Sequence, residues 1–259
     1  MKEKFPQTIF DDEIENDIES IEDINETVKR LNNGILKDGL KAFSSDILPY
    51  VKRGEGDRII IIKEASLEEM INVYELGDAE LDYMHTSSHF RTDKPLEVYS
   101  WMKISQRNVV SDLGVFEKAW LIEEIQSDLL QKTKNKKLKE VSRDKCEMCN
   151  GKGGVNVTKT EYVKCNKCFG AGSIPNYQKE LLEDVKSAAK EIGVDVFLMP
   201  TSETILEQYA GLMKDTKAKL LYETVPESID FERVETNEIS LSREEGEPVN
   251  SRVFWKKKI

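Results

Sequence analysis

Two pairs of cysteines constrain the fold of this chain more than any other feature. Cys146 and Cys149 form the first pair, Cys165 and Cys168 form the second, and fifteen residues lie between the pairs. Two C-x2-C pairs at this separation can place four thiolates around one tetrahedral zinc ion, and the glycines after each pair let the backbone turn toward the sulfurs. Four sulfur ligands leave no position for water, so we expect a structural rather than a catalytic zinc. Two disulfides or an iron–sulfur cluster are the alternatives; cytosolic C-x2-C pairs rarely persist as disulfides.

Each half of this segment has the full pattern C-x-x-C-x-G-x-G. Cys146–Gly172 resembles the cysteine-rich zinc-binding region of DnaJ-type co-chaperones, which uses four such repeats for two zinc ions. The two repeats of this chain have enough cysteines to bind one zinc ion. The chain has no His-Pro-Asp tripeptide, so we carry over the zinc site and not the co-chaperone activity. The ligands that this resemblance implies are Cys146, Cys149, Cys165 and Cys168.

The segment around the cysteines is basic although the whole chain is acidic. The chain has a formal net charge of -11, whereas Gln131–Cys168 holds eleven Lys or Arg and four acidic residues. With four thiolates and one Zn²⁺ added, that segment keeps a charge of about +5. It is either a solvated flap or a surface for phosphate or for an acidic protein. The overall acidity argues against duplex DNA, but RNA or single strands stay an alternative, with Tyr162 and Phe169 as stacking faces.

The N-terminal residues 1–55 are expected to be a helical, acidic segment. Residues 1–26 hold ten acidic residues and two lysines. Apolar residues recur at helical spacing, which predicts a helix over about Asp11–Leu31, ended at Gly34, and a second helix over Ile35–Lys52. The acidic face is either solvated or a docking surface for a basic partner.

Residues 56–259 are expected to form an α/β or α+β core, with residues 131–175 as the basic zinc-binding insertion. Arg58–Ile62 is continuous and β-branched, as in a strand that is buried on both faces, and Ser66 with Glu69 forms a capping box for the helix that follows. Alternation of strands and helices indicates layered architecture. The further strands expected are Val98–Ile104, Ala119–Gln126, Asp195–Met199, Phe231–Glu235 and Arg252–Lys258, and the further helices are Tyr177–Ile192, closed by Gly193, and Ser202–Thr224.

Hydropathy predicts a soluble, cytoplasmic protein. The longest apolar runs are far shorter than the roughly 18 residues of a membrane span. The N-terminus lacks the apolar stretch of about 7–15 residues that a secretory signal has. We therefore expect no membrane partner and reduced thiols.

Polar residues of catalytic type gather at one predicted strand end. The hexapeptide Glu-Glu-Ile-Gln-Ser-Asp ends at Asp128 and follows an apolar run, and His85 and His89 lie four residues apart. Strand ends are where α/β proteins place their sites. Glu124 or His89 is a candidate general base, and Asp128 or Gln126 a candidate to orient a substrate. Alternatively, Asp128 caps a helix and the histidines lie on a surface.

Residues from about Met84 to Val234 resemble a domain of large phage and prophage proteins of uncertain function. The hexapeptide is the most specific part of this resemblance. It implies a phage origin, the host cytoplasm as the location, and a host or phage protein as a partner. The segments that carry it are His89–Pro95, Trp101, Ile122–Asp128, Thr201–Glu203, Gln208–Tyr209, Leu221–Tyr222 and Pro226.

The order of elements also resembles the GNAT family of acyl-CoA N-acyltransferases. In this resemblance Arg58–Ser66 begins the fold and Ala119–Gln126 is the central strand. Leu181–Ile192 and Val194–Met199 are the next helix and strand, and Arg252–Lys258 is the last strand.

The GNAT resemblance implies a mixed sheet with flanking helices and acyl transfer from acetyl-CoA or another acyl-CoA to an amine. Glu124 or His89 would deprotonate the amine, strand amides would hold the thioester oxygen, and Tyr222 would protonate the departing CoA.

The cofactor loop of that family, Arg/Gln-x-x-Gly-x-Gly/Ala, does not follow Asp128, because the basic insertion stands in its place. Either the insertion has taken over phosphate binding or the domain has lost the cofactor. The rival readings are a non-catalytic protein that binds its partner through the zinc insertion, and an RNA-binding or single-strand-binding protein.

Overall fold

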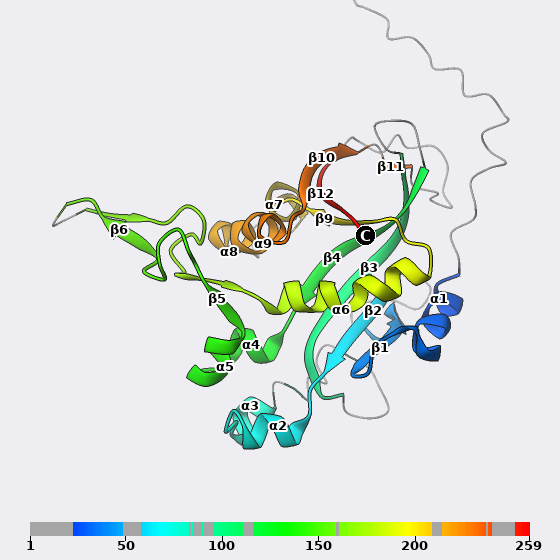
Figure 1. Ribbon diagram of the computed structural model, residues 1–259, viewed down its shortest axis with the longest axis horizontal. Coiled ribbons are helices and arrows are strands. Elements are labelled where there is room, and N and C mark those ends of the chain that lie inside the picture. Colours follow the sequence, from blue (N-terminus) through cyan, green and yellow to red (C-terminus); the bar gives the residue numbers. More distant parts are fainter. Residues whose placement is uncertain are drawn as a thin grey trace, which may run out of the picture.

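The computed structural model describes residues 23–48, 58–82, 84, 90, 96–110, 116–158, 161–208, 214–236, 238–239 and 252–259. Within them the chain has a mixed α+β fold with one large sheet and flanking helices (Figure 1). No helix in these ranges is long and apolar enough to cross a membrane.

The large sheet has eight strands in the described residues, in the order β1-β2-β3-β4-β9-β12-β10, with β11 paired to β3. Neighbours are antiparallel except for β4 and β9, which are parallel. The predicted strands are confirmed within three residues at each end, except that β3 runs six residues beyond the predicted end at Ile104. The strands are β1 (Leu40–Ser44), β2 (Arg58–Glu64), β3 (Val98–Val110), β4 (Phe116–Gln126), β9 (Val196–Pro200), β10 (Glu232–Thr236), β11 (Glu238–Ile239) and β12 (Arg252–Lys258).

Strand β2 is buried on both faces, as its continuous isoleucines predict. Ile59 and Ile61 belong to one hydrophobic cluster, and Ile60 and Ile62 belong to a second. All four side chains are fully buried. Since successive side chains of a strand point to opposite faces, a continuous apolar run is the pattern that covers both faces.

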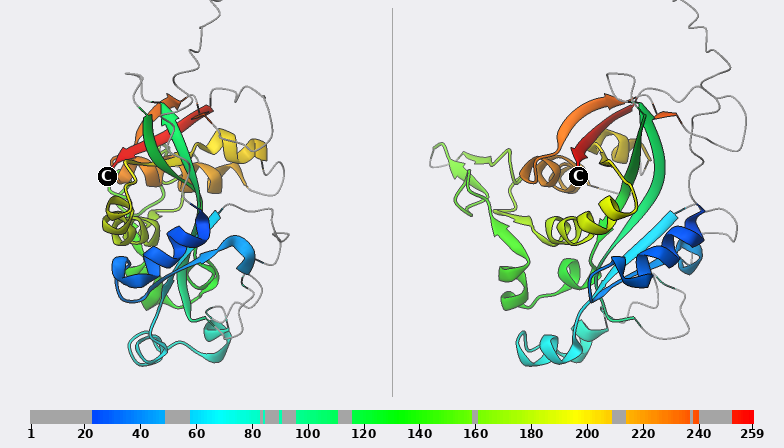
Figure 2. Two further views of the ribbon diagram at one scale, coloured as in Figure 1. Left: turned by 90° about the vertical axis from the view of Figure 1, so that its right-hand side faces the viewer. Right: turned by 45° about the vertical axis from the view of Figure 1, so that its right-hand side comes forward.

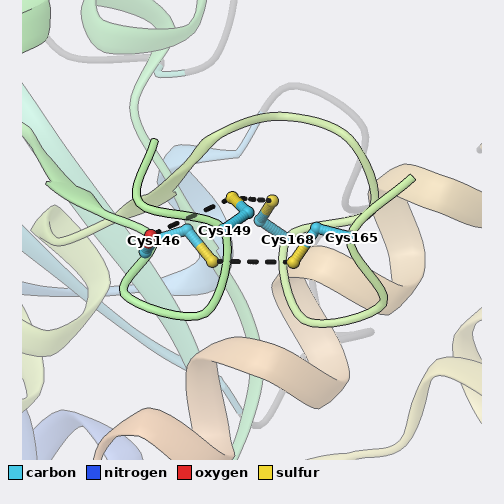
Figure 3. Close-up of side chains that lie close together, drawn as sticks. All are labelled: Cys146, Cys149, Cys165 and Cys168. Atoms are coloured by element: carbon cyan, nitrogen blue, oxygen red, sulfur yellow. Dashed lines mark hydrogen bonds between the residues drawn. The ribbon is translucent and has the colours of Figure 1, made fainter. Parts of the chain in front are cut away.

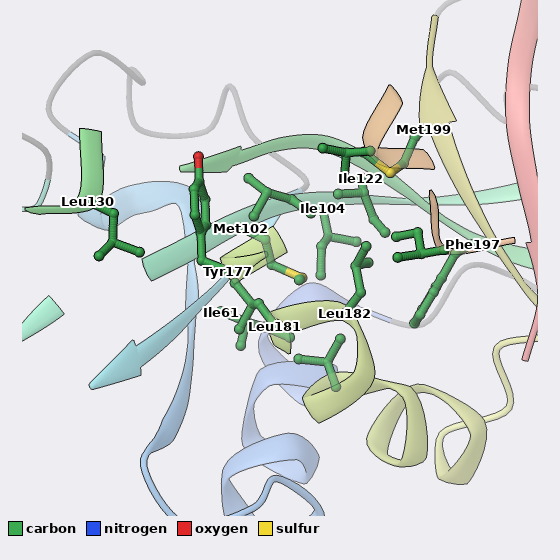
Figure 4. Close-up of a cluster of buried hydrophobic side chains, with 14 of the residues drawn as sticks. Ile61, Met102, Ile104, Ile122, Leu130, Tyr177, Leu181, Leu182, Phe197 and Met199 are labelled. Carbon is green, nitrogen blue, oxygen red and sulfur yellow. The ribbon is translucent and has the colours of Figure 1, made fainter. Parts of the chain in front are cut away.

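Helix α6 (Tyr177–Glu191) covers one face of the sheet (Figures 2 and 4). Its Leu181 and Leu182 pack in one cluster with Met102 and Ile122 of the strands. Each such side chain contributes about 1.5–3 kcal/mol when it is buried. Gly193 follows the helix with φ of 88°, a left-handed conformation that ends it.

The N-terminal segment contributes to the sheet, which the predicted helix over Ile35–Lys52 did not anticipate. Residues Leu40–Ser44 form strand β1, which pairs with β2. Leu40 and Ala42 are buried and Lys41 is exposed, a period of two that fits the pairing. The prediction was wrong here because strand pairing, a long-range interaction, outweighed the local helical spacing.

The helix predicted over Asp11–Leu31 falls partly outside the described residues, which include α1 (Ile24–Arg30). Asp23 caps α1 through its side chain, and Gly34 has φ of 100° in the turn Leu31–Ile35 that follows. The stop expected at this glycine is confirmed.

The remaining helices are short. Ser66 Oγ accepts from the Glu69 amide at the start of α2, so the predicted cap is confirmed. The helix expected over Ser202–Thr224 is divided into several. These helices are α2 (Leu67–Asn72), α3 (Asp78–Leu81), α4 (Asp128–Lys132), α5 (Lys136–Val141), α7 (Ser202–Gln208), α8 (Asp215–Lys219), the wide turn η4 (Leu220–Thr224) and α9 (Val225–Ser228), with a 3-10 turn at Ser45–Ile47.

The segment Arg143–Pro175, here named the cysteine module, projects from the end of the sheet (Figures 1 and 2). Its stem is the antiparallel pair β5 (Arg143–Lys145) and β8 (Ser173–Pro175). Its outer part is the hairpin of β6 (Gly154–Asn156) and β7 (Tyr162–Lys164). Two short antiparallel strand pairs therefore make up the described part of the module.

Candidate metal centre and adjoining pocket

The four cysteines of the module meet at one point between the stem and the outer hairpin (Figure 3). Their sulfur atoms all lie within 4.8 Å of one another. Cys146 Sγ lies 3.8 Å from Cys165 Sγ, and Cys149 Sγ lies 3.7 Å from Cys168 Sγ. Each short distance therefore joins one pair of the sequence to the other.

These distances fit a tetrahedral metal ion and exclude disulfides. A disulfide requires about 2.05 Å between sulfurs, and none of the four cysteines is in one. A tetrahedron with metal–sulfur bonds of about 2.3 Å has edges of about 3.8 Å. The cysteine cluster can thus hold a metal ion, and all four side chains are buried from water.

The two C-x-x-C-x-G-x-G repeats have the same backbone conformation. Asn150 and Phe169 both have positive φ, at 51° and 50°. The amide of Gly153 donates to Cys149 Sγ at 3.2 Å. Burial opposes ionisation of Cys149, but this hydrogen bond and the neighbouring thiols lower its pKa to about 7. The backbone of the site thus favours the thiolate that a metal ion requires.

The cysteine module is attached to the core on two sides. Along the stem, the amide of Cys146 donates to Gly172 O, and the amide of Asn176 donates to Ser142 O. On the other side, Thr224 Oγ1 of η4 donates to Lys167 O. The module therefore contacts the core both through its stem and through η4.

Beside the module, strands β4 and β9 part. Their register in the described residues covers three pairs, Ala119–Leu121 with Val196–Leu198. Strand β4 continues to Gln126 without β9 beside it, and Ile125 O accepts instead from Gln178 Nε2 of α6, at 3.4 Å. Gln178 Oε1 is buried without a hydrogen-bond partner among the described residues. Beyond Leu121 this edge of β4 thus has no strand partner among the described residues, and Gln178 occupies it at Ile125.

A pocket of about 310 Å³ lies beyond the end of β4, between α4, the stem of the module and the helices that follow β9. Ser142 and Tyr177 are buried in its wall, whereas Gln131 and Lys217 are exposed. Its volume is at the lower end of the range for small-molecule sites. The lining residues are Leu130, Gln131, Ser142, Arg143, Pro175, Tyr177, Lys217, Leu220 and Leu221.

Tyr177 connects this pocket electrostatically to the hexapeptide of β4. Burial raises the pKa of Tyr177 to about 12, and the charges of Glu124 and Asp128 add to the rise. The side chain of Gln131 and the charge of Arg143 act in the opposite direction. The Tyr177 hydroxyl therefore stays protonated at neutral pH and can donate a hydrogen bond.

The first glutamate of the hexapeptide is the centre of an ion-pair cluster. Glu123 lies 3.0 Å from Arg58 Nε and 3.2 Å from Lys103 Nζ, and Ser105 Oγ donates to it. Burial opposes ionisation of Glu123, but these three partners lower its pKa. Glu124 lies 4.0 Å from Lys103 Nζ. The register shift between β3 and β4 at this point permits both glutamates to reach Lys103.

The structure brings only part of the predicted catalytic set together. The charge of Glu124 helps to raise the pKa of Tyr177, which lines the pocket. Asp128 is the first residue of α4, but the residue that caps this helix is Ser127. Tyr222 is buried in η4 and is not among the residues that line the pocket; its carbonyl accepts from Trp255 Nε1 at 2.6 Å. His89 lies outside the described residues.

Sequence reasoning missed Tyr177, Arg143 and Lys217 as pocket residues. They lie on three elements, α6, β5 and α8, that meet only in the fold. One signal was present: Tyr177 opens the predicted helix after the insertion, and Arg143 precedes the first cysteine pair. Both positions are near the ends of the insertion, where it joins the core.

The outer part of the cysteine module exposes apolar side chains. In soluble proteins, apolar side chains that gather on one exposed element mark interaction surfaces. The exposed apolar residues of the outer part are Met148, Val155, Val157, Tyr162 and Val163.

No protein-family model matches the sequence, and neither a curated protein nor a solved structure matches it at a significant level.

Proposed function

We propose that the cysteine module binds one structural zinc ion and that the core is an acyltransferase of GNAT type. In the proposed reaction a primary amine attacks the carbonyl carbon of an acyl-CoA thioester. The C–N bond forms, the C–S bond breaks, the amine loses a proton to a base, and the CoA thiolate takes up a proton. Zinc is favoured by the four buried sulfur ligands, since a complete thiolate shell suits a structural zinc.

The parting of β4 and β9 is the observation that carries the acyl-transfer proposal. A strand edge without a neighbour offers amide groups that can bind a thioester oxygen as negative charge develops on it. The edge of β4 beyond Leu121 is of this kind, and it leads to the pocket at the strand end. The elements expected from the GNAT resemblance are present in their order as β2, α2, β4, α6, β9 and β12.

Glu124 is the proposed base within the described residues. Its carboxylate is half-buried at the end of β4, and Lys103 Nζ lies 4.0 Å from it. Tyr222 remains the proposed acid for the thiolate, and His89 an alternative base. Tyr177 lines the pocket, where the charge of Glu124 acts on it, and is a second candidate acid.

Calorimetric titration of the zinc-loaded protein with CoA and acetyl-CoA tests the proposal directly. Saturable binding of both is expected, and turnover is then measured with a panel of amines. The Tyr222→Phe variant is expected to lower turnover by about 10²-fold or more while folding is kept. Tyr162→Phe, which alters an exposed tyrosine of the module, is the matched control. Absence of any CoA binding would remove acyl transfer from consideration.

The zinc assignment has its own test. Native mass spectrometry is expected to find one zinc ion per chain, and none in Cys165→Ser. A reddish, iron-containing protein with visible absorption would identify an iron–sulfur centre instead.

A second function is favoured by the exposed apolar hairpin. The segment Gln131–Cys168, which contains most of the module, is basic, and the hairpin exposes apolar side chains, so the partner that fits them is an acidic protein with apolar side chains. The phage-domain resemblance makes a host or phage protein in the host cytoplasm the candidate source.

A photo-reactive residue at Val155 tests this interaction, with the same residue at exposed Ile71 of α2 as control. A protein cross-linked from Val155 alone is then purified and titrated against the wild type and against Val155→Ser. Weaker binding by Val155→Ser, and an affinity that falls with salt, are expected. Equal affinity would overturn the interaction, and capture of RNA would favour the nucleic-acid alternative.

A further inference from the structure

Two cationic side chains line the pocket, and neither forms an ion pair with a carboxylate of the described residues. Arg143 Nε donates to Ser173 Oγ at 2.8 Å, and Lys217 Nζ donates to Gln131 Oε1 at 3.2 Å. In a chain of net charge -11, two such cations at one pocket make a local positive site that favours an anion.

A third group in the wall is also unsatisfied. Ser142 is 1% exposed, and its Oγ has no hydrogen-bond partner among the described residues. A buried hydroxyl without a partner costs about 1–3 kcal/mol. A ligand oxygen in the pocket would supply the missing partner. The hydroxyl of Tyr177, protonated at neutral pH, is a further donor in the same wall.

The carboxylates nearest to the pocket are engaged elsewhere. Asp128 lies 3.4 Å from Lys132 Nζ, and Glu124 lies 4.0 Å from Lys103 Nζ. Each of these carboxylates has a lysine of its own nearby, and neither forms an ion pair with Arg143 or Lys217. The amides of Gly153 and Gly172 already donate to cysteine sulfurs, so these two glycines do not offer a second anion-binding site in the module.

We propose that this pocket binds phosphate, held by Arg143, Lys217 and Ser142, and that it replaces the absent glycine loop as the site for the pyrophosphate of CoA. The second part rests on the proposed acyl transfer. Arg143 suits the role because its planar guanidinium matches phosphate oxygens. Its place in β5, opposite Pro175, makes the stem of the cysteine module one wall of the site.

Calorimetry of the zinc-loaded full chain with inorganic pyrophosphate, and separately with CoA, tests the proposal. We expect the wild type to bind both, and Arg143→Gln and Lys217→Gln to bind each about tenfold more weakly. Lys190→Gln removes one positive charge at the exposed end of α6 and is the matched control, with an expected change below about twofold.

The Ser142→Ala variant separates a binding role from a structural one. It removes the buried hydroxyl without adding volume, so unfolding temperature should be kept or raised. Weaker pyrophosphate binding with an unchanged unfolding temperature is expected of a ligand contact. Unchanged binding in Ser142→Ala and Arg143→Gln alike would overturn the assignment.

The two titrations also separate the phosphate site from the proposed acyl transfer. Binding of pyrophosphate but not of CoA would keep the site and dismiss the cofactor. Binding of CoA with equal affinity by Arg143→Gln, Lys217→Gln and the wild type would keep the cofactor and dismiss the site. Failure of the wild type to bind either compound would overturn both.

Discussion

Gly153 and Gly172 occupy equivalent positions in the two cysteine repeats, and each amide donates to the second cysteine sulfur of its own repeat at 3.2 Å. Each glycine also presses against the opposite repeat. A Cβ atom on Gly153 would lie 2.5 Å from Gly170 O, and one on Gly172 would lie 2.5 Å from Gly151 O. The two halves of the metal site are thus packed backbone against backbone.

This packing predicts that Gly153→Ala weakens the metal site. The new methyl group would meet a carbonyl oxygen at a distance that real structures do not show, and φ of 74° is unfavourable for alanine. We expect a loss of about 1–3 kcal/mol from strain at this position. Release of zinc to a chromogenic chelator should be faster by tenfold or more. Gly77→Ala, where the added carbon meets nothing within 4 Å, should release zinc at the wild-type rate.

Removal of the metal should unfold the outer part of the cysteine module and leave the sheet folded. The module buries its cysteines but exposes Val155 and Val163, so it has little apolar core of its own. Hydrogen exchange after chelation is expected to rise sharply at Cys165, whose amide donates to Gly153 O. The amides of β2 should keep their protection. Loss of protection in β2 as well would show that the metal supports the whole fold.

Glu123→Gln should destabilise the protein at neutral pH by about 1–3 kcal/mol, because it breaks the cluster with Arg58, Lys103 and Ser105. The pKa of Glu123 is lowered in the folded state. Its contribution is therefore complete above the pKa of the unfolded chain, about 4.3, and is lost as pH falls through the folded value.

Urea unfolding at several pH values measures this effect. The difference between wild type and Glu123→Gln should be largest near pH 7 and shrink below about pH 4. Glu140→Gln, at an exposed position of α5, should change stability little at any pH. A difference that persists at pH 3 would mean that packing, and not charge, is responsible.

Asp230→Gly should stabilise the protein by up to about 1 kcal/mol. Asp230 is exposed and has φ of 62°, in the left-handed region, where glycine has no steric cost. Asp230→Val is expected to lose about 1–2 kcal/mol, because a branched side chain is disfavoured there. Thermal unfolding of the two variants should therefore shift in opposite directions from the wild type.

Local patterns predicted the parts of the fold that depend on local chemistry. The run Arg58–Ile62 indicated a doubly buried strand, and Ser66 indicated the start of α2. Arg252–Lys258 is a strand over its full predicted length. In each case a short run of neighbouring residues carries the signal, so the strand or cap could be predicted without knowing which elements pack against it.

Strand β1 and the pocket could not be predicted from local patterns. Leu40–Ser44 becomes a strand because β2 offers it an edge, and that pairing joins residues far apart in the chain. The cysteines were grouped correctly because their spacing is a local motif. Tyr177, Arg143 and Lys217 carry no such motif, and only the folded arrangement places them in one wall.

The stem of the cysteine module brings Arg143 and Pro175 directly opposite each other, so the chain leaves the core and returns to it at one place. A segment with adjacent ends can be inserted or deleted in a gene without displacing the strands on either side. Gain, loss or exchange of the cysteine module would therefore leave the two ends of the core joined at the same place.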